Sequence, residues 1–386
     1  MKAPVYPVFQ SEEYESRLLG VRARMAARGI DALVTTTPEN IFYLSGYQTP
    51  GYYFFLALIV SMEKDPVLIP PPHEESLVAA YSWVDEYRIY PDTSDGVETA
   101  LDVLRELGLT NSKVAIELGS WFPTSGDLLR LGDGLPRANV VDSNGLVEEG
   151  RLIKSEAELD QMRSAAAVSA AGMQAGLDAI REGVTERELA AEVYRAQILA
   201  GGEYSALPAF VTSGERSLLV HATWSDRRVS GGDVVFLEVP GTVNRYHAVH
   251  SRCAVIGDAP DLLQLGFEVN SDALRLAKEQ IQPGVEVAEA FQVAKDRIDG
   301  ADVPYTQGRR IAYGIGLAFP PDWGEGHIIS INGNEHREFR PGMTFHVITT
   351  MRLPGLGAIG CSDTVAVTAD GCETLTGEVP VEVALK

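Results

Sequence analysis

The first 150 residues alternate short apolar segments with helical stretches, and this alternation restricts the fold more than any other feature of the chain. Apolar, β-branched segments of strand length stand between stretches whose apolar residues recur at helical spacing. Such alternation is typical of an α/β domain, in which helices cover a sheet. The predicted strands are residues 31–37, 52–60, 66–69, 87–90 and 113–117, and the predicted helices are residues 74–84, 97–107 and 124–131.

A second domain is predicted to begin near residue 151, where the pattern changes. Ser155 and Glu158 stand three residues apart before an alanine-rich stretch, which is the sequence signature of a helix N-terminus. Thr185 and Glu188 repeat that signature before the next helical stretch. We therefore expect a small α/β domain over residues 1–150 and a larger domain over residues 151–386.

The larger domain repeats one local pattern about a hundred residues apart. Residues 179–184 (AIREGV) and 280–285 (QIQPGV) each end in a Gly-Val turn. A helical stretch with an acidic residue in its first turn follows each of them, as the helix dipole favours. Strand-like segments come after each half, so the repeat indicates an internally duplicated domain. These segments are residues 234–239, 253–256, 343–347 and 364–368.

The composition excludes several classes of protein. Thirty-two basic and 54 acidic residues leave a formal charge of −22, which argues against nucleic acid and anionic membranes as partners. The three cysteines fit neither a disulfide framework nor a CxxC metal site. The longest apolar run, residues 52–62, is shorter than the roughly 20 residues that span a bilayer. Because the N-terminal residues also lack a signal-peptide pattern, we expect a cytoplasmic protein.

Several histidines are candidates for catalysis, because histidine exchanges protons near neutral pH. His221 follows an apolar run, and His346 alternates with apolar residues on a predicted strand. A structural role is the competing interpretation for both. His247 and His250 stand three residues apart on a predicted strand, so they should point to opposite faces and at most one should face a pocket.

Glu238 interrupts an apolar strand, which makes it the most conspicuous carboxylate of the chain. A buried carboxylate must be paired, hydrogen-bonded or bound to a cation. A salt bridge with Arg252 is one interpretation. We favour a functional site, because ionisable groups inside strands tend to be functional.

Residues 319–327 (FPPDWGEGH) combine prolines with glycines, which predicts a shaped loop rather than a helix or strand. Asp322 and Glu325 could hold a cationic substrate there, and Trp323 could cover it through a cation–π contact. A tight surface turn is the alternative interpretation.

An aromatic segment at residues 47–55 is either the wall of a site or part of the core. Phe54 is predicted to lie in the core, whereas Tyr47, Tyr52 and Tyr53 stay open. The sequence has no GxGxxG after a strand, no phosphate loop, no GxSxG and no HExxH. Dinucleotide, phosphoryl-transfer, serine-hydrolase and zincin chemistry therefore lack support.

Five segments carry a family resemblance: residues 40–47, 154–158, 232–238, 340–345 and 363–368. With them the chain resembles the creatinase/aminopeptidase P/prolidase superfamily over nearly its whole length. The resemblance implies an N-terminal creatinase-like α/β domain and a C-terminal α+β domain of the pita-bread fold with an internal pseudo-two-fold duplication. The loop at residues 319–325, together with residues 313–316, is most similar to the metal-independent branch of ectoine hydrolase and creatinase.

The resemblance also implies where the superfamily's peptidases bind two metal ions, through two Asp, one His and two Glu. These positions fall here on Glu238, Val249, Tyr313, Ile348 and Ser362. Only Glu238 offers a carboxylate, whereas metal sites need several converging ligands. We therefore expect no metal centre and no cofactor.

The metal-free branch implies a cationic substrate, which needs a base to activate water, carboxylates to hold the cation and donors for its own carboxylate. The resemblance to creatinase implies His221 as the general base, and Glu238 would bind or polarise the amidinium. The predicted catalytic residues are His221, Glu238, Tyr313 and His346. The predicted substrate-binding residues are Tyr47, Tyr52, Tyr53, His247, His250, Asp322, Trp323 and Glu325.

The expected activity is metal-independent hydrolysis of a C–N bond in a small cyclic amidine or guanidino compound. The resemblance to creatinase further implies a homodimer, in which the N-terminal domain of one subunit covers the site of the other. Three alternatives stay open. They are an Xaa-Pro peptidase with rearranged metal ligands, a lyase on the same scaffold, and a binding protein without catalytic activity.

Overall fold

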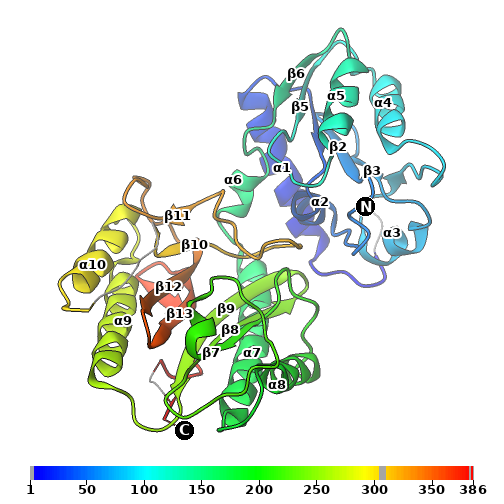
Figure 1. Cartoon of the computed structure of the whole chain (residues 1–386). Coiled ribbons are helices and arrows are strands. Elements are labelled where there is room, and N and C mark those ends of the chain that lie inside the picture. Colours follow the sequence, from blue (N-terminus) through cyan, green and yellow to red (C-terminus); the bar gives the residue numbers. More distant parts are fainter. Residues whose placement is uncertain (1–3, 304–309, 382–383, 386) are drawn as a thin grey trace. The chain divides into compact units, whose positions relative to one another are not determined.

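The computed structural model describes residues 4–303, 310–381 and 384–385 of the chain (Figure 1). They divide into two compact units, Met1–Arg151 and Leu152–Lys386. Each unit has its own sheet and its own hydrophobic core, and the α/β class predicted from the sequence is confirmed. Among the residues described, no helix combines the length and the apolar character needed to cross a membrane.

Unit 1 is built on a six-stranded mixed sheet in the order β4-β3-β2-β1-β5-β6. Strand β1 pairs antiparallel with β2 and parallel with β5. The strands are β1 (Ala32–Thr35), β2 (Ala57–Ser61), β3 (Val67–Ile69), β4 (Glu86–Tyr87), β5 (Lys113–Ile116) and β6 (Asn139–Asp142). The helices are α1 (Ser11–Ala27), α2 (Pro38–Ser45), α3 (Glu75–Tyr81), α4 (Gly96–Glu106), α5 (Ser125–Asp133) and α6 (Glu148–Arg151).

The aromatic segment before β2 differs from the prediction. The predicted strand over residues 52–60 begins only at Ala57, because a turn closed by the Phe54 N–H and the Gly51 carbonyl precedes it. Phe54 is 45% exposed, so its predicted place in the core is wrong. A continuous apolar run does not distinguish a buried strand from a turn followed by a strand.

Unit 2 contains a nine-stranded sheet whose main path is β11-β10-β12-β13-β9-β8-β7. Its strands are β7 (Phe210–Ser213), β8 (Val234–Val243), β9 (Tyr246–Val255), β10 (Ala312–Gly314), β11 (Ser330–Ile331), β12 (Thr344–Leu353), β13 (Gly357–Val367), β14 (Cys372–Thr374) and β15 (Ala384–Leu385). Its helices are α7 (Glu156–Ala179), α8 (Glu186–Leu199), α9 (Asp261–Gln280) and α10 (Val287–Asp299), with a short 3₁₀ turn at Gly214–Leu218. Capping boxes begin α7 and α8, as Ser155 and Thr185 predicted.

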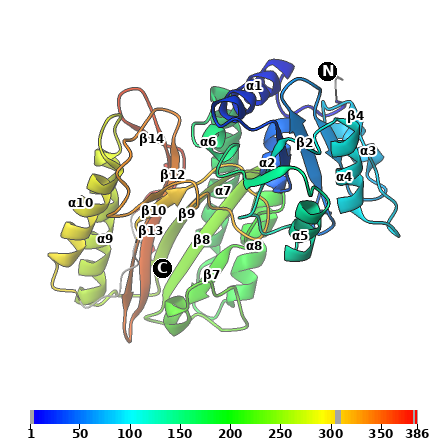
Figure 2. The same cartoon turned by 90° about the horizontal axis from the view of Figure 1, so that it is seen from above.

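The order of these elements shows the predicted duplication. Helices α7 and α8 precede β7, β8 and β9, and helices α9 and α10 precede β10, β12 and β13. The two strand triplets meet where Ser251 of β9 pairs with Ser362 of β13, so that β10-β12-β13 mirrors β7-β8-β9 and only β11 at one end of the path has no counterpart. Figure 2 shows the two helix pairs beside their own halves of the sheet.

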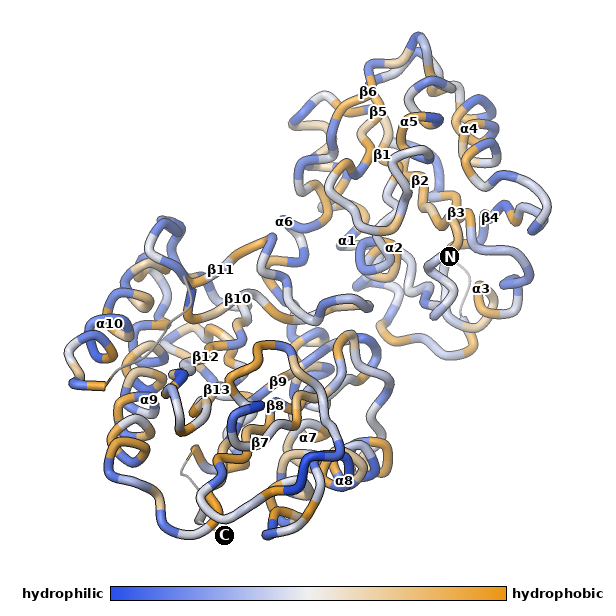
Figure 3. Tube along the Cα trace, viewed as in Figure 1, coloured by the Kyte–Doolittle hydropathy of each residue, from blue (hydrophilic) through white to orange (hydrophobic). Residues whose placement is uncertain are grey.

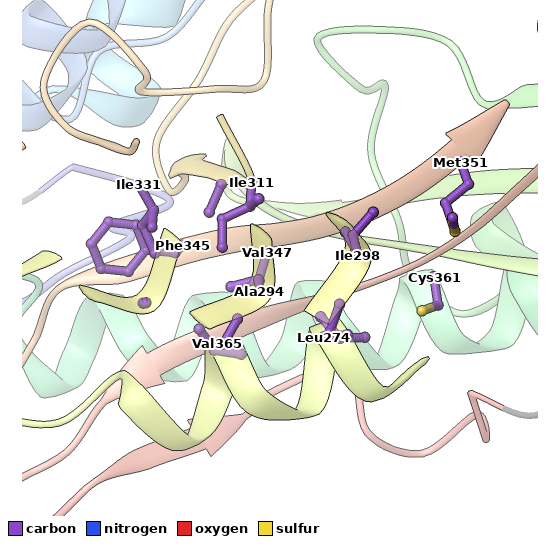
Figure 4. Close-up of a cluster of buried hydrophobic side chains, with 14 of the residues drawn as sticks. Leu274, Ala294, Ile298, Ile311, Ile331, Phe345, Val347, Met351, Cys361 and Val365 are labelled. Carbon is purple, nitrogen blue, oxygen red and sulfur yellow. The ribbon is translucent and has the colours of Figure 1, made fainter. Parts of the chain in front are cut away.

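The helix pairs bury one face of this sheet, which we call the helix face. Side chains of α9 and α10 pack on β12 and β13, as the labelled cluster around Phe345, Val347 and Val365 shows (Figure 4). A second cluster joins α7 and α8 to β8, through residues that include Met173, Val193 and Leu237. Hydrophobic residues accordingly concentrate along the strands (Figure 3). The opposite face, which we call the site face, carries the polar residues described next.

Candidate active site

Strand pairing sets Glu238, Ser251 and Ser362 in one row across the site face. Glu238 of β8 pairs with Ser251 of β9, and Ser251 pairs with Ser362 of β13. Residues that pair directly across antiparallel strands project to the same face and lie close together. The neighbouring strands add His346 and Tyr313, which pair with each other across β12 and β10. The structure thus brings together three of the four predicted catalytic residues.

Glu238 is buried, and no hydrogen bond or ion pair holds its carboxylate within the described part of the chain. Burial alone raises its pKa from 4.5 to about 7, because desolvation disfavours the charged form. The salt bridge with Arg252 is not formed, since Arg252 pairs with Asp363 on the helix face. A buried carboxylate without a protein partner is suited to bind a cationic ligand.

Tyr313 and His346 form a hydrogen-bonded group beside this carboxylate. The Tyr313 hydroxyl lies 2.8 Å from His346 Nδ1, and His346 Nε2 lies 2.7 Å from Ser362 Oγ. Burial, together with the nearby Arg310 charge, lowers the pKa of His346 to about 3, so the imidazole is neutral at physiological pH. Burial and the charge of Glu238 raise the pKa of Tyr313. Because the charge of Glu238 acts on Tyr313, the phenol and the carboxylate lie close enough to interact electrostatically.

The predicted loop at residues 319–327 supports Tyr313 and includes one residue near the site. Trp323 is buried, donates its indole N–H to the Tyr313 hydroxyl at 2.8 Å, and packs its ring 5.6 Å from that of Phe210. Its position therefore argues against a cation–π cover. Asp322 is half-buried and adds to the rise in the pKa of Tyr313, so it lies close enough to act on a cation there.

Glu325 forms an ion pair with Lys154 at 2.6 Å, and both side chains are almost fully buried. A carboxylate that already neutralises a buried ammonium is poorly placed to hold a cationic substrate. The pair instead fixes the loop to the start of unit 2. The sequence could not show this, because the two residues are 171 positions apart.

His221 lies at the edge of the site and is exposed, in a left-handed backbone conformation with φ of 61°. Its ring packs 5.7 Å from that of Phe210, and Phe210 pairs directly with Glu238 across β7 and β8. His221 is therefore not a core histidine. One aromatic ring stands between it and the row that contains Glu238, and its role as a base stays a prediction.

His247 and His250 point to opposite faces of β9, as their spacing predicts. Both nitrogens of His247 bind the backbone, at the Arg245 carbonyl (3.0 Å) and the Ala206 N–H (3.1 Å). His250 lies on the helix face, where its Nδ1 is 2.8 Å from Ser169 Oγ of α7. These positions argue against the predicted contacts of both histidines with substrate.

The three tyrosines of unit 1 have different surroundings. Tyr47 is buried and donates its hydroxyl to the Glu74 carboxylate, so it belongs to the core of unit 1. Tyr52 is half-buried against Phe122, at a ring distance of 5.4 Å, and Tyr53 is 77% exposed. Only Tyr52 and Tyr53 are thus accessible for a contact outside their own unit.

Sequence reasoning missed three residues at the site. Ser251 and Ser362 were not candidates, because a serine in a strand carries no signal of its own and their row depends on the long-range pairing of β9 with β13. Arg310 was also missed; its guanidinium lies 4.7 Å from the centre of the Tyr313 ring. A lone arginine before a predicted strand does not reveal that contact.

The five positions that the resemblance assigns to the metal ligands of the superfamily's peptidases do not fit a metal centre here. Glu238 is the single carboxylate among them, and Tyr313 and Ser362 are engaged with His346. Val249 and Ile348 are hydrocarbon side chains on the same face. Throughout the described ranges, no group of three or more His, Cys, Asp or Glu side chains is arranged to bind a metal ion.

Comparison with known families identifies the class of the protein. Residues 160–369 match metallopeptidase family M24, and residues 17–153 match the creatinase/prolidase N-terminal domain. The chain belongs to this family of hydrolases, which confirms the superfamily and the fold predicted from the sequence. Among the described residues, however, no group of three or more His, Cys, Asp or Glu side chains is arranged to hold the metal that the family name implies.

Individual relatives include both branches of the superfamily. The chain is 30% identical to the ectoine hydrolase of Halomonas elongata, over 95% of this chain and 96% of that protein. It is 24% identical to an Xaa-Pro dipeptidase of Pyrococcus horikoshii, over 91% and 94% of the two chains. The prolidase structure from Pyrococcus horikoshii superposes with a TM-score of 0.82 at 22% identity, covering 96% of this chain and all of that chain. This structural likeness shows a shared fold.

Proposed function

We propose that the protein is a metal-independent hydrolase that opens a C–N bond of a small cyclic amidine or guanidino compound, such as ectoine or creatine. The observation that carries this proposal is the Glu238 carboxylate, which is buried on the site face without a partner among the described residues. An amidinium or guanidinium would supply the missing charge and two N–H donors. The 30% identity to an ectoine hydrolase supports the same substrate class.

The site face offers groups for each part of such a reaction. Glu238, with Asp322 nearby, binds the cation and favours the protonated form, which is the electrophilic one. His221 takes a proton from the attacking water. Tyr313 and Ser362 present hydroxyl groups to the tetrahedral intermediate. Because the substrate carbon is already electrophilic, this chemistry does not need a Lewis acid.

Arg310 is a candidate partner for the carboxylate of the substrate. Its guanidinium is exposed and lies over the Tyr313 ring, so it carries a positive charge next to the phenol. Glu238 and Arg310 act on Tyr313 with opposite electrostatic effects, which favours a zwitterionic ligand bound between them. Ectoine and creatine are both zwitterions of this kind.

Turnover of a substrate panel tests the proposal. Purified protein is incubated with ectoine, hydroxyectoine, creatine and an Xaa-Pro dipeptide, and products are identified by NMR. We expect an opened amidine or guanidine, no dipeptide cleavage and a loss of at least about a hundredfold in Glu238→Gln. The matched control is Glu279→Gln, which changes an exposed acid of α9 and should keep full activity. Dipeptide cleavage alone, or an olefinic product, would contradict it.

We also propose that the protein acts as a cytoplasmic homodimer in which unit 1 of each subunit covers the site of the other. The exposed aromatic side chains of unit 1 support this, with Tyr53 77% and Trp121 68% exposed. Large exposed apolar groups in one region mark interaction surfaces. Sedimentation should show a dimer that Tyr53→Ser with Trp121→Ser weakens, whereas Leu199→Ser in unit 2 should not. A monomeric wild-type protein would rule the dimer out.

A further inference from the structure

Four hydrogen bonds join Trp323, Tyr313, His346 and Ser362 into one chain across the site face and end at the backbone N–H of Ser251. The donor–acceptor distances are 2.8 Å from Trp323 to Tyr313, 2.8 Å from Tyr313 to His346, 2.7 Å from His346 to Ser362 and 2.7 Å from the Ser251 nitrogen to Ser362. Indole and backbone N–H groups can only donate. Tyr313, His346 and Ser362 form the central trio of this chain. The hydroxyl oxygens at its two ends, on Tyr313 and Ser362, therefore each accept a hydrogen bond from outside the trio.

The remaining hydrogens allow two arrangements. Neutral His346 carries one N–H, so it donates at one nitrogen and accepts at the other. In the first arrangement, Tyr313 donates to Nδ1, Nε2–H donates to Ser362, and the Ser362 hydrogen is left over. In the second arrangement, Ser362 donates to Nε2, Nδ1–H donates to Tyr313, and the Tyr313 hydrogen is left over. Each arrangement makes both links, and each offers one hydrogen at one end only.

We propose that Tyr313, His346 and Ser362 form a proton relay, which moves one proton between its two ends by exchanging these arrangements. The trio is well placed for this, because both ends lie on the face that carries Glu238 and because Ser362 stands in the same row. Ser251 pairs with Glu238 on one side and with Ser362 on the other, and its buried hydroxyl has no hydrogen-bond partner among the described residues. A ligand that occupies this row therefore meets both ends.

The relay supplies the proton transfer that the proposed hydrolysis requires, and this step rests on the proposed function. Attack of water on the amidinium carbon forms a C–O bond and releases one proton, and cleavage of the C–N bond requires one proton at the leaving nitrogen. The proton that His221 takes from the water is passed on to Ser362, as the serine hydrogen passes to His346 Nε2. The Nδ1 hydrogen passes to Tyr313, and the Tyr313 hydrogen passes to the leaving nitrogen. No charge stays on the imidazole and no co-reactant is consumed.

Burial explains why a relay is preferred to a charged histidine. His346 and Ser362 have no exposed surface, and charging an imidazole in such surroundings is costly. A concerted exchange of hydrogens between neutral groups avoids that cost. His346 is thus a positioning residue that acts through Tyr313 and Ser362, whereas Tyr313 gives its proton to the substrate.

The tautomer of His346 tests the relay without any substrate. The ¹⁵N NMR spectrum is recorded for the full chain, with His346 assigned by comparison with His346→Gln. An orphaned buried N–H is avoided more strongly than an orphaned lone pair. Tyr313→Phe should therefore hold the hydrogen at Nε2, facing Ser362, and Ser362→Ala should hold it at Nδ1, facing Tyr313. The same tautomer in both variants, or an imidazolium at pH 7, would overturn the relay.

A second measurement tests the transfer during turnover, with ectoine as the probe. The wild-type protein should show a solvent isotope effect with a curved proton inventory, because several hydrogens move together. Tyr313→Phe and Ser362→Ala should each lower kcat by roughly a hundredfold, change KM by less than about threefold, and give a linear inventory. A linear inventory in the wild-type protein would overturn the relay. If ectoine is not turned over, the proposed function fails for this substrate, and the NMR result still decides whether the relay exists.

Discussion

At the scale of single residues, Glu238 controls both the proposed chemistry and a measurable part of the stability. Burial holds its pKa near 7 in the folded chain, against 4.5 for an ordinary Glu. Burying this acid therefore makes the free energy of unfolding depend on pH. Folding disfavours the ionised carboxylate, and a bound cation would reverse that effect.

The free energy of unfolding should fall as the pH rises through the interval between these two values. Above pH 4.5 the Glu238 carboxyl of the unfolded chain loses its proton, while that of the folded chain keeps it until about pH 7. The loss amounts to on the order of 3 kcal/mol and is complete above pH 7. Urea titrations of wild-type protein and Glu238→Gln at pH 5 and pH 8 measure it by difference. An equal change in both proteins would contradict the assigned burial effect.

At the scale of elements, the loop at residues 319–327 depends on one buried ion pair. Breaking such a pair leaves a buried charge and typically costs about 3–5 kcal/mol. Lys154→Met should therefore strongly lower the free energy of unfolding, measured by urea denaturation. Lys295→Met, which breaks the surface pair with Asp299 on α10, should cost less than about 1 kcal/mol. Equal costs for the two variants would show that the pair does not hold the loop.

The close contact between α7 and β8 depends on the absence of a side chain at Gly241. A Cβ atom at Gly241 would lie 1.9 Å from the Ala165 carbonyl oxygen and 2.5 Å from the Ser169 nitrogen, so a backbone would have to move. Gly241→Ala should lower the melting temperature and weaken activity, because β8 carries Glu238. Gly132→Ala in α5 meets nothing within 4 Å and should stabilise by about 0.5–1 kcal/mol. Thermal melts of both variants check the contrast, which a stable Gly241→Ala would contradict.

The elements were largely predictable from the sequence, because they depend on local signals. Capping boxes at Ser155 and Thr185 located two helices, and short strand-like segments located parts of the long strands. The site was predictable only in part. Glu238, Tyr313 and His346 stood out by their surroundings or by family position. Ser362 also fell on a family position, but its place beside Ser251 depends on a strand pairing, and the role of Glu325 depends on a partner far away in the sequence. Long-range contacts of this kind leave no local pattern.

At the scale of the whole molecule, the chain has the fold of a metallopeptidase family, and its described residues contain no group of three or more His, Cys, Asp or Glu side chains arranged for a metal ion. The duplicated half-sheets meet at Ser251 and Ser362, so the line between the two repeats runs through the site. The positions that the resemblance assigns to the metal ligands of the family's peptidases carry here a buried carboxylate, two hydroxyl groups and two hydrocarbon side chains. The chain therefore keeps the fold of the family with a different set of side chains at these positions.

Hydrolysis of ectoine by metal-depleted protein tests this account most directly. The protein is dialysed against EDTA, its metal content is measured by elemental analysis, and ring opening is followed by NMR. We predict a rate within about twofold of the untreated protein when the metal content is far below one ion per chain, and no increase on addition of Mn²⁺ or Zn²⁺. Loss of activity on chelation, with recovery on adding back a divalent metal, would contradict the account.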